Sequence, residues 1–449
     1  RWMMAEGART QQSMFWAVPS CVPSLDGMET AGAILDADAI DELLALPGVI
    51  ALGEVMDYRA VVSGAQRMAG ILAVARRRGV IIDGHCPNLD GAELQRYLLA
   101  GVDSDHCKND AGPFGEKLRL GMTLMLQEKS FTPEVMAAMD ALPYPPDVCI
   151  VTDDIAADVI AYDGHLDHVA RVARRAGMAP IAVLRALTLA PARRLRLHDR
   201  GVVAPGRRAD LALITDLDKF RVRGVVVGGR RVGEQPVPAR RFTDSVRVGA
   251  GALAAREWTT ELPDGEHLFR AIRVNPIDTS TRADAVTLPV RDGVVQWEGR
   301  CTVIERHEAS GRVAHAPVLG MQLDQGAVAT TYAHDSHNLT VIGTSAEAAA
   351  AAAARVVELD GGIVVRARTG DAELALPIGG VMTDAPLADV AEATGRIREA
   401  LERWGWGHRI PFMSISTLTL PVSPALKISD YGLIDVLDRS FATPTMAAS

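Results

Sequence analysis

Four side chains that commonly bind divalent metal ions follow apolar, β-like runs in the first third of the sequence. They are Glu54, His85, His106 and Asp153. Two carboxylates and two imidazoles suit a hard or borderline ion. Such an ion lowers the pKa of a bound water from roughly 15.7 to about 7, which supplies hydroxide at neutral pH. A carboxylate such as Asp153 can take the proton from this nucleophile and pass it to a leaving amine. The pattern therefore favours hydrolytic deamination or amide hydrolysis.

Each of these residues also has an ordinary structural explanation. Glu54 could be an acid at the start of a loop, and either histidine could be a hydrogen-bonded loop residue. Asp153 and its neighbour Asp154 could cap the helix that follows them. Four such residues at four strand ends would be a rare coincidence, so the metal-site interpretation is favoured over the structural one.

The elements that would position these side chains alternate between β-like runs and helical stretches from Met14 to about Leu195, which is typical of parallel β/α units. The predicted strands are Met14–Val18, Val49–Leu52, Val80–Ile82, Val102–Ser104, Leu118–Leu124 and Val148–Val151. The predicted helices are 1–10, Asp38–Ala45, Ser63–Arg78, Gly91–Ala100, Thr132–Ala141 and Asp167–Gly177. A (β/α)₈ barrel of the metal-dependent hydrolase type places its site at the strand C-termini, where the four candidates fall. Six strands are visible where eight are needed, so we expect two strands upstream of Arg1 and a chain that is a fragment.

The remaining chain predicts two further domains. Residues 1–198 form the partial barrel, 199–240 a small β-domain with a linker marked by Pro236, Pro238 and the Arg240–Arg241 pair, and 241–449 a C-terminal α+β domain. In this last domain we expect strands within Ala327–Gly343 and at Ile363–Ala367. Helices are predicted at Ala346–Leu359, which is rich in alanine, and at Asp389–Trp404.

Composition excludes several classes of partner. The net charge of −9 argues against binding to a nucleic-acid backbone. The clusters Arg76–Arg78 and Arg193–Arg194 are interpreted as solvated helix ends. Five cysteines without a C-x-x-C pair favour a reducing compartment. No run approaches a membrane span and no signal pattern opens the chain, so we expect a cytoplasmic protein without membrane contact.

Two nucleotide motifs and one zinc motif are also missing from the sequence. It contains no Walker A loop and no Gly-x-Gly-x-x-Gly fingerprint, so a nucleotide cofactor is not expected. The small zinc deaminases need Pro-Cys-x-x-Cys, which does not occur in this chain.

Longer motifs resemble the adenine deaminases of the amidohydrolase superfamily. They are Val18–Ser24, Gly53–Met56, Asp83–His85, Ser104–His106, Thr152–Asp154, Gly164–His168, Ala204–Gly206, Ala209–Leu211, Ala333–Asn338 and Leu418–Val422. Gly-Glu-Val-Met and Ala-His-Asp-Ser-His-Asn together are specific to this family, whereas Ala-Asp-Leu marks only the superfamily. The resemblance covers almost the whole chain.

The resemblance implies hydrolysis of a C–N bond in a cyclic amidine, with adenine converted to hypoxanthine and ammonia by metal-bound hydroxide attacking C6. Two ions of manganese or iron would be used, with zinc as an alternative. Glu54 would bridge the ions, His85 and His106 would be ligands, and Asp153 would serve as ligand and proton shuttle. Asp154, His334 and His337 are candidates for binding the purine, the small-molecule partner. A homo-oligomer is an open alternative to a monomer.

The chain departs from the family pattern at three places. The family's His-x-His pair and the glutamate after it, which lie on the first barrel strand, are absent from this sequence. Cys107 stands where the family usually has Glu, and Cys86 and Asn88 replace a small residue and a glycine. Two alternatives to adenine deamination therefore stay open. One is an amidohydrolase acting on another amino-heterocycle or cyclic amide, and the other is a catalytically inactive fragment.

Overall fold

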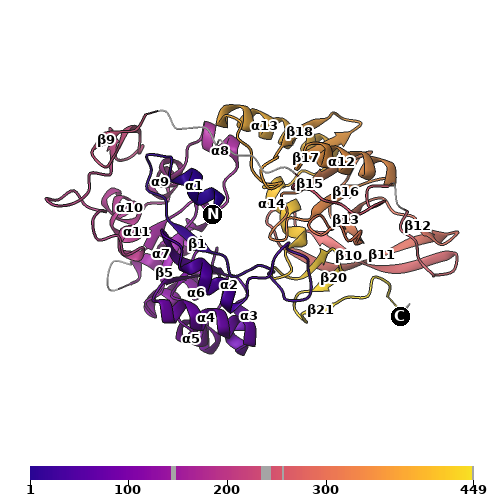
Figure 1. Ribbon diagram of the computed structural model, residues 1–449, viewed down its shortest axis with the longest axis horizontal. Helices are drawn as coiled ribbons and strands as arrows, with labels where there is room; N and C mark the ends of the chain where they lie inside the picture. The colour runs from indigo at the N-terminus through magenta and orange to yellow at the C-terminus, as the bar shows by residue number, and fades with distance from the viewer. Residues whose placement is uncertain (143–147, 234–243, 255–256, 447–449) are drawn as a thin grey trace. The chain divides into compact units, whose positions relative to one another are not determined.

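A computed structural model of the 449-residue chain describes residues 1–142, 148–233, 244–254 and 257–446 (Figure 1). The chain divides into two compact units. Unit 1 consists of Arg1–Cys21 and Leu35–Pro238, and unit 2 of Val22–Ile34 and Ala239–Ser449. Within the described residues, none of the helices has the length and apolar character needed to cross a membrane. The predicted linker at Pro236–Arg241 lies outside the described residues, and the boundaries at 198 and 240 stay predictions.

Unit 1 contains six parallel strands, paired in the orders β1-β2-β3 and β4-β5-β6. They are β1 (Trp16–Val18), β2 (Val49–Val55), β3 (Ile81–Gly84), β4 (Ser104–Asp105), β5 (Thr123–Leu126) and β6 (Val148–Ile150). Each predicted strand overlaps one of them. The mixed α/β character of the prediction is confirmed. Closure into a barrel stays a prediction, because the described strands pair as two sheets of three.

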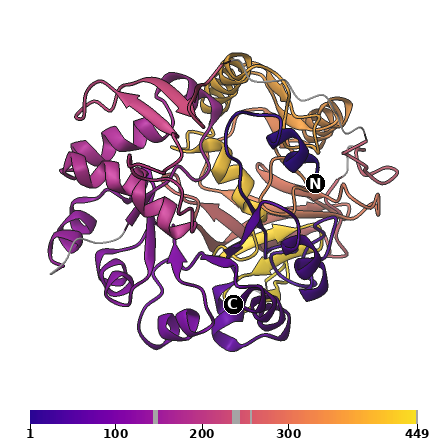
Figure 2. The ribbon, with the colours of Figure 1, turned by 60° about the vertical axis from the view of Figure 1, so that its left-hand side comes forward.

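Helices follow the strands of unit 1 and lie around them, in indigo to magenta in Figure 2. They are α1 (Trp2–Gly7), α2 (Ala37–Leu44), α3 (Tyr58–Ser63), α4 (Gln66–Arg78), α5 (Gly91–Leu99), α6 (Ala111–Arg119), α7 (Pro133–Asp140), α8 (Ala157–Tyr162), α9 (Leu166–Arg175), α10 (Pro180–Leu187) and α11 (Leu189–Arg194). Local signals set several starts: Asp36 and Thr132 accept hydrogen bonds from the first-turn N–H groups of α2 and α7.

One strand boundary predicted in unit 1 is wrong. Leu118 belongs to α6 and not to a strand, because it packs a helical face with Phe114 into the core. The predicted helix Ser63–Arg78 is found as α4, which begins at Gln66. Gly64 adopts a left-handed conformation with φ of 71° and ends α3, a separate short helix that the sequence pattern did not predict.

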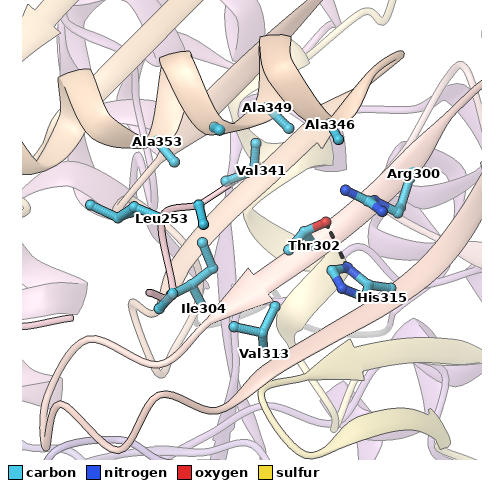
Figure 3. A pocket seen from close by; sticks show the side chains of 13 residues that line it. Leu253, Arg300, Thr302, Ile304, Val313, His315, Val341, Ala346, Ala349 and Ala353 are labelled. Carbon is cyan, nitrogen blue, oxygen red and sulfur yellow. Dashed lines mark hydrogen bonds between the residues drawn. The ribbon is translucent and has the colours of Figure 1, made fainter. Parts of the chain in front are cut away.

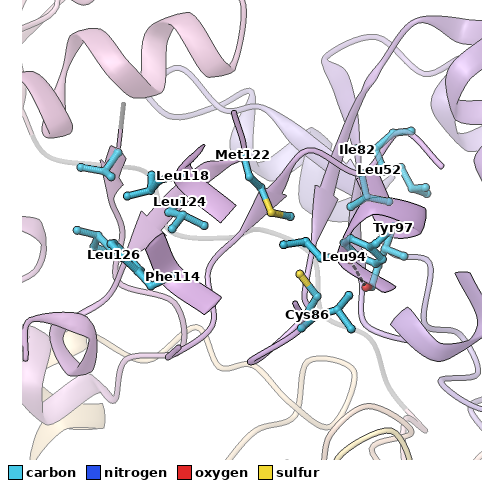
Figure 4. Close-up of a cluster of buried hydrophobic side chains, with 14 of the residues drawn as sticks. Leu52, Ile82, Cys86, Leu94, Tyr97, Phe114, Leu118, Met122, Leu124 and Leu126 are labelled. Carbon is cyan, nitrogen blue, oxygen red and sulfur yellow. Dashed lines mark hydrogen bonds between the residues drawn. The ribbon is translucent and has the colours of Figure 1, made fainter. Parts of the chain in front are cut away.

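Figure 4 shows part of the hydrophobic core that joins these elements. Side chains from β2, β3 and β5 meet side chains from α5 and α6. Leu52, Leu94 and Tyr97 have 0% relative exposure. Burial of this apolar surface fixes the strands and therefore fixes where their C-terminal ends lie.

A small antiparallel sheet ends the described part of unit 1. Its strands are β7 (Leu211–Ile214), β8 (Val222–Val227) and β9 (Arg230–Arg231). These strands lie within residues 199–240, where the sequence predicts a small β-domain.

Unit 2 is built on a nine-stranded sheet in the order β12-β11-β10-β14-β13-β16-β15-β17-β18. Its strands are β10 (Gly265–Val274), β11 (Thr281–Arg291), β12 (Val294–Val295), β13 (Arg300–Ile304), β14 (Val313–Leu319), β15 (Gly326–Thr330), β16 (Leu339–Gly343), β17 (Gly362–Ala367) and β18 (Ala372–Ala375). A second, three-stranded sheet comprises β19 (Leu426–Ser429), β20 (Gly432–Asp435) and β21 (Ser440–Phe441). Its helices are α12 (Ala346–Glu358), α13 (Leu387–Trp404) and α14 (Pro411–Ser416).

Helices α12 and α13 cover opposite faces of the large sheet. Ala327, Val341 and Val364 pack with the alanines of α12. Their chain neighbours Val328, Ile342 and Val365 pack with Leu401 and Trp404 of α13. Successive strand residues point to opposite faces, so both faces of β15, β16 and β17 are buried. This explains why every residue of β15 and β16 is buried.

A pocket lies in unit 2 under the alanine face of α12 (Figure 3). Ala346, Ala349 and Ala353 form its roof, and Arg300 and Thr302 of β13 line it with His315 of β14. The Oγ of Thr302 and the Nδ1 of His315 are 3.0 Å apart. None of the candidate site residues named from the sequence lines this pocket.

The segment Val22–Ile34, which follows β1 in the sequence, belongs to unit 2. The carboxylate of Asp430 accepts hydrogen bonds from the Thr30 backbone N–H at 3.0 Å and from its hydroxyl at 2.6 Å. The amide of Asn338 donates to the Thr30 carbonyl at 2.9 Å, and the Ser429 hydroxyl donates to the carbonyl of Met28. The segment is therefore joined to two parts of unit 2 that lie far from it in the sequence.

Glu29 is buried within the same segment, with 6% relative exposure. Its Oε1 accepts from the backbone N–H and the hydroxyl of Ser24, while Oε2 has no hydrogen-bond partner among the described residues. Burial raises the pKa of Glu29 to about 7, although the Ser24 hydrogen bonds oppose this, and Asp335 and Asp430 raise it further. The carboxyl group is therefore held in its neutral form below pH 7.

We expect Glu29 to make folding stability fall as the pH rises. A raised folded-state pKa contributes fully below the ordinary value of 4.5 and is lost as the pH rises through about 7. Relative to Glu29→Gln, which stays neutral, the wild type should lose up to about 3 kcal/mol of unfolding free energy between pH 4.5 and 8. Urea unfolding followed by tryptophan fluorescence measures this, and Glu261→Gln, at an exposed site of the same unit, is the control. Parallel pH profiles for the wild type and Glu29→Gln would contradict it.

Candidate metal centre

Three of the four predicted ligands meet at the C-terminal ends of β2, β3 and β4. The Oε2 of Glu54 lies 2.7 Å from the Nε2 of His106 and 2.9 Å from the Nδ1 of His85. The two imidazole nitrogens are 3.3 Å apart. Strands β2 and β3 are parallel neighbours and end at the same edge of their sheet, while β4 of the other sheet lies beside the end of β3, where the Gly84 N–H donates to the Ser104 hydroxyl at 3.2 Å. Residues 31 and 52 positions apart in sequence therefore converge.

The main chain of β3 sets which nitrogen of His106 faces this cluster. The Nδ1 of His106 lies 3.1 Å from the carbonyl oxygen of Gly84, which can only accept a hydrogen bond. Nδ1 therefore carries a proton and donates it, leaving Nε2 toward Glu54. A backbone carbonyl behind a histidine is the usual support for a metal ligand.

Charge is concentrated at the cluster. Burial alone would raise the pKa of Glu54, but hydrogen bonds from His106 and His85 lower it, so the carboxylate stays ionised. Burial opposes a charge on His106, yet the hydrogen bond and charge of Glu54, with Asp153 and Asp105, raise its pKa to about 9. Glu54 therefore supplies a permanent negative charge that either a proton or a cation on the histidine nitrogens must balance.

Gly84 permits the close approach of β3 to its neighbours. A Cβ at this position would lie 2.2 Å from the Ser104 carbonyl oxygen and 2.9 Å from the Tyr97 hydroxyl. That hydroxyl accepts the backbone N–H of His85 at 3.0 Å and donates to the Val55 carbonyl at 2.9 Å. The buried tyrosine thus connects the ends of β2 and β3 directly beside two of the candidate ligands.

A buried ion pair supports the loops that carry both histidines. The side chains of Asp105 and Lys117 have 0% relative exposure, and Nζ lies 2.8 Å from Oδ2. Asp105 Oδ1 accepts the backbone N–H groups of Cys86 and Cys107, the residues that follow His85 and His106. Lys117 also donates to the Cys86 carbonyl and to Asn109. Sequence analysis missed this pair, because nothing local to Lys117 distinguishes it from a surface lysine on a helix.

Asp153 lies beside the cluster and is joined to it by Gln127. The Gln127 amide donates to the Asp153 carboxylate and, at 2.8 Å, to the carbonyl of His106. Asp153 has a φ of 57°, which is uncommon outside glycine and typical of residues constrained by their surroundings. Asp153 and Asp154 are both exposed, and the cap of α8 is Ala156 and neither aspartate. Gln127 carried no sequence signal.

The interpretation of Arg194 as a solvated helix end is wrong. Its side chain is 9% exposed, and it forms ion pairs with Asp83 at 2.8 Å and Asp103 at 2.5 Å. It also donates to the carbonyl of Ile82 and to the Ser104 hydroxyl. Arg194 therefore joins β3 and β4 to α11. Arg77 and Arg78, by contrast, lie at the end of α4 and pair with Asp41 near the surface.

His334 and His337, the candidates for substrate binding, lie in unit 2 in the turn between β15 and β16. Their rings are 5.9 Å apart. Burial lowers the pKa of His337 to about 3, with the charges of His334 and Arg306 adding to the effect. His334 donates its backbone N–H to the Ser416 hydroxyl, and its carbonyl accepts from Thr419. The substrate-binding roles of these residues and of Asp154 stay predictions.

Comparisons with known proteins agree across the chain. Residues 3–232 match the amidohydrolase family and residues 278–440 match the adenine deaminase C-terminal domain. Adenine deaminase 2 of Shouchella clausii is 35% identical over 453 residues, covering 97% of this chain and 79% of that protein. An adenine deaminase of Methylobacterium sp. (strain 4-46) is 38% identical over 437 residues, covering 95% and 76%. The solved N-acetyl-D-glucosamine-6-phosphate deacetylase of Mycobacterium smegmatis has 18% identity and a TM-score of 0.35, over 44% of this chain and 62% of that one.

The first of these matches defines the class of protein, an amidohydrolase. Within that class the chain belongs to the adenine deaminase family. The family resemblance inferred from the motifs is confirmed.

Loss of Lys117 should destabilise the protein strongly. Lys117→Met leaves the buried Asp105 carboxylate without its cation, which costs about 3–5 kcal/mol of unfolding free energy. Asp105→Asn combined with Lys117→Met removes the charge but keeps an acceptor for the Cys86 and Cys107 N–H groups, so it should recover part of the loss. Urea denaturation measures both, and Lys108→Met, at an exposed position nearby, should stay within about 0.5 kcal/mol of wild type. Equal stability of Lys117→Met and Lys108→Met would refute a stabilising role for the pair.

Proposed function

We propose that this protein is a metal-dependent hydrolase that converts adenine and water to hypoxanthine and ammonia. The observation that carries the proposal is the convergence of Glu54, His85 and His106 at adjacent strand ends, in a chain that belongs to the adenine deaminase family. The substrate is accordingly a small purine.

The residues present suit a divalent ion. Glu54 offers an ionised oxygen, and His85 and His106 offer nitrogens within 3.3 Å of each other and within 2.9 Å of that oxygen. We assign these three as ligands of manganese or iron in a binuclear site, with zinc as an alternative and Asp153 as the further carboxylate. When bound, a divalent ion lowers the pKa of water and makes it a nucleophile at neutral pH.

The side chains of the protein stabilise charge and transfer protons during the reaction. Water adds through its oxygen to C6 of adenine, and the C6–N bond to the amino group breaks. Asp153 takes the proton from the attacking water and delivers it to the leaving nitrogen, so that ammonia departs. Gln127 holds one oxygen of Asp153, which orients the carboxylate for this transfer. Glu54, whose pKa is lowered by hydrogen bonds from His106 and His85, would supply the negative charge that holds the cation.

The substrate assignment is tested by ammonia release. The metal-loaded protein should release one ammonia per adenine consumed, with hypoxanthine as the other product, measured by a coupled ammonia assay and by chromatography. Ammonia release from another amino-heterocycle, with adenine untouched, would replace adenine by that substrate. A protein that binds metal but turns over no such compound would support the inactive alternative.

Glu54→Gln tests whether Glu54 is needed to retain the metal. The neutral amide removes the negative charge that balances a cation, so bound metal after dialysis and adenine turnover should both fall, the latter by about 100-fold or more. Metal analysis of the dialysed protein is the measurement. Glu42→Gln, at an exposed position of α2, is the matched control and should retain wild-type metal content. Unchanged metal content in Glu54→Gln would remove Glu54 from the ligand set.

A further inference from the structure

Cys107 adds a sulfur atom, another possible metal ligand, beside the nitrogens of the two histidines. Its Sγ, a nitrogen of His85 and a nitrogen of His106 all lie within 4.8 Å of one another. The Glu54 oxygen adjoins both histidines at 2.7 and 2.9 Å. Two imidazole nitrogens and one sulfur therefore lie close enough together to hold one ion, and Glu54 adjoins the two histidines.

Hydrogen bonds of its main chain fix the position of Cys107. Its backbone N–H donates to Asp105 Oδ1 at 3.2 Å, and its carbonyl accepts from the Asn109 amide at 3.0 Å. Asp105 is itself held by Lys117 and by Asn109 Nδ2, both at 2.8 Å. A fixed backbone on the residue directly after His106 gives the sulfur a defined place in the cluster before any ion binds.

We propose that Cys107 is a ligand of the same divalent ion as His85 and His106, which makes the centre select a softer metal. The inference rests on the proposed metal site but not on adenine as the substrate. Thiolate ligands favour zinc, cobalt and iron over manganese, whereas a carboxylate favours manganese. Cys107 stands where the family usually has Glu after Ser-Asp-His, so this chain carries a soft sulfur atom in place of a harder carboxylate.

The other cysteines do not offer the same chemistry. Cys86, Cys149 and Cys301 are buried, with 0–2% relative exposure, and none of them belongs to the group formed by His85, His106 and Cys107. Cys21 is partly exposed and is not part of the group formed by His85, His106 and Cys107. A sulfur–metal signal lost on changing Cys107 alone can therefore be assigned to this residue.

Cobalt substitution tests the ligand directly. The full-length protein loaded with Co²⁺ should show an intense near-ultraviolet thiolate-to-cobalt charge-transfer band. Cys107→Ser should lose the band while still binding cobalt through the remaining ligands, and Cys21→Ser should keep it. Circular dichroism of each variant establishes that it is folded. A cobalt-loaded wild type without the band, or a folded Cys107→Ser that keeps it, would overturn the proposal.

Metal competition supplies a second readout with a conservative replacement. At equal free zinc and manganese, the zinc-to-manganese ratio bound by Cys107→Glu should fall by about 10-fold or more relative to wild type. An unchanged zinc-to-manganese ratio would contradict the proposal that Cys107 determines which metal is bound. If the wild type retains manganese but neither cobalt nor zinc, only this proposal fails, and if it retains no divalent metal at all, the proposed function fails as well. If the band is present but adenine is not hydrolysed, only the substrate assignment fails.

Discussion

The candidate site of unit 1 depends on one buried ion pair, Asp105 with Lys117. Taking both charges out of water is costly, and only the short contact between them and the surrounding hydrogen bonds offset this. Asp105 uses its other oxygen to hold the main chain directly after each candidate histidine. A change in the pair would therefore move His85 and His106 together, although neither charged group touches a substrate.

The strand ends around the pair are packed closely enough to leave little freedom. Gly84 has no room for a methyl group, and Tyr97 links the ends of β2 and β3 by two hydrogen bonds. Arg194 adds a buried connection from α11 to β3 and β4. These contacts hold Glu54 close to the histidines despite the unfavourable burial of its charge. Preorganisation of this kind is what a metal or a developing charge requires, because no reorganisation is then needed at the moment of binding.

Unit 2 meets a different constraint. Its central strands are buried on both faces, so α12 and α13 must each present a continuous apolar surface. The alanines of α12 achieve this by allowing the helix to lie close to the sheet, while Leu401 and Trp404 of α13 fill the space on the other side. The segment Val22–Ile34 is tied to the same unit by Asp430 and Asn338, and it carries the buried Glu29.

The sequence by itself determined the alternation of strands and helices, the family, and the four strand-end residues, because apolar periodicity and strand-end motifs are local properties. It predicted correctly that Glu54, His85 and His106 lie in one cluster, since neighbouring parallel strands have their C-terminal ends on the same side. Tertiary structure alone decided the partners that hold them. Lys117, Gln127 and Arg194 are ordinary polar residues in sequence, and only folding buries them against charges or carbonyls far away in the chain. The same reason applies to Cys107: its type is visible in the sequence, but the nearness of its sulfur to two imidazoles is decided by the packing of β3 and β4.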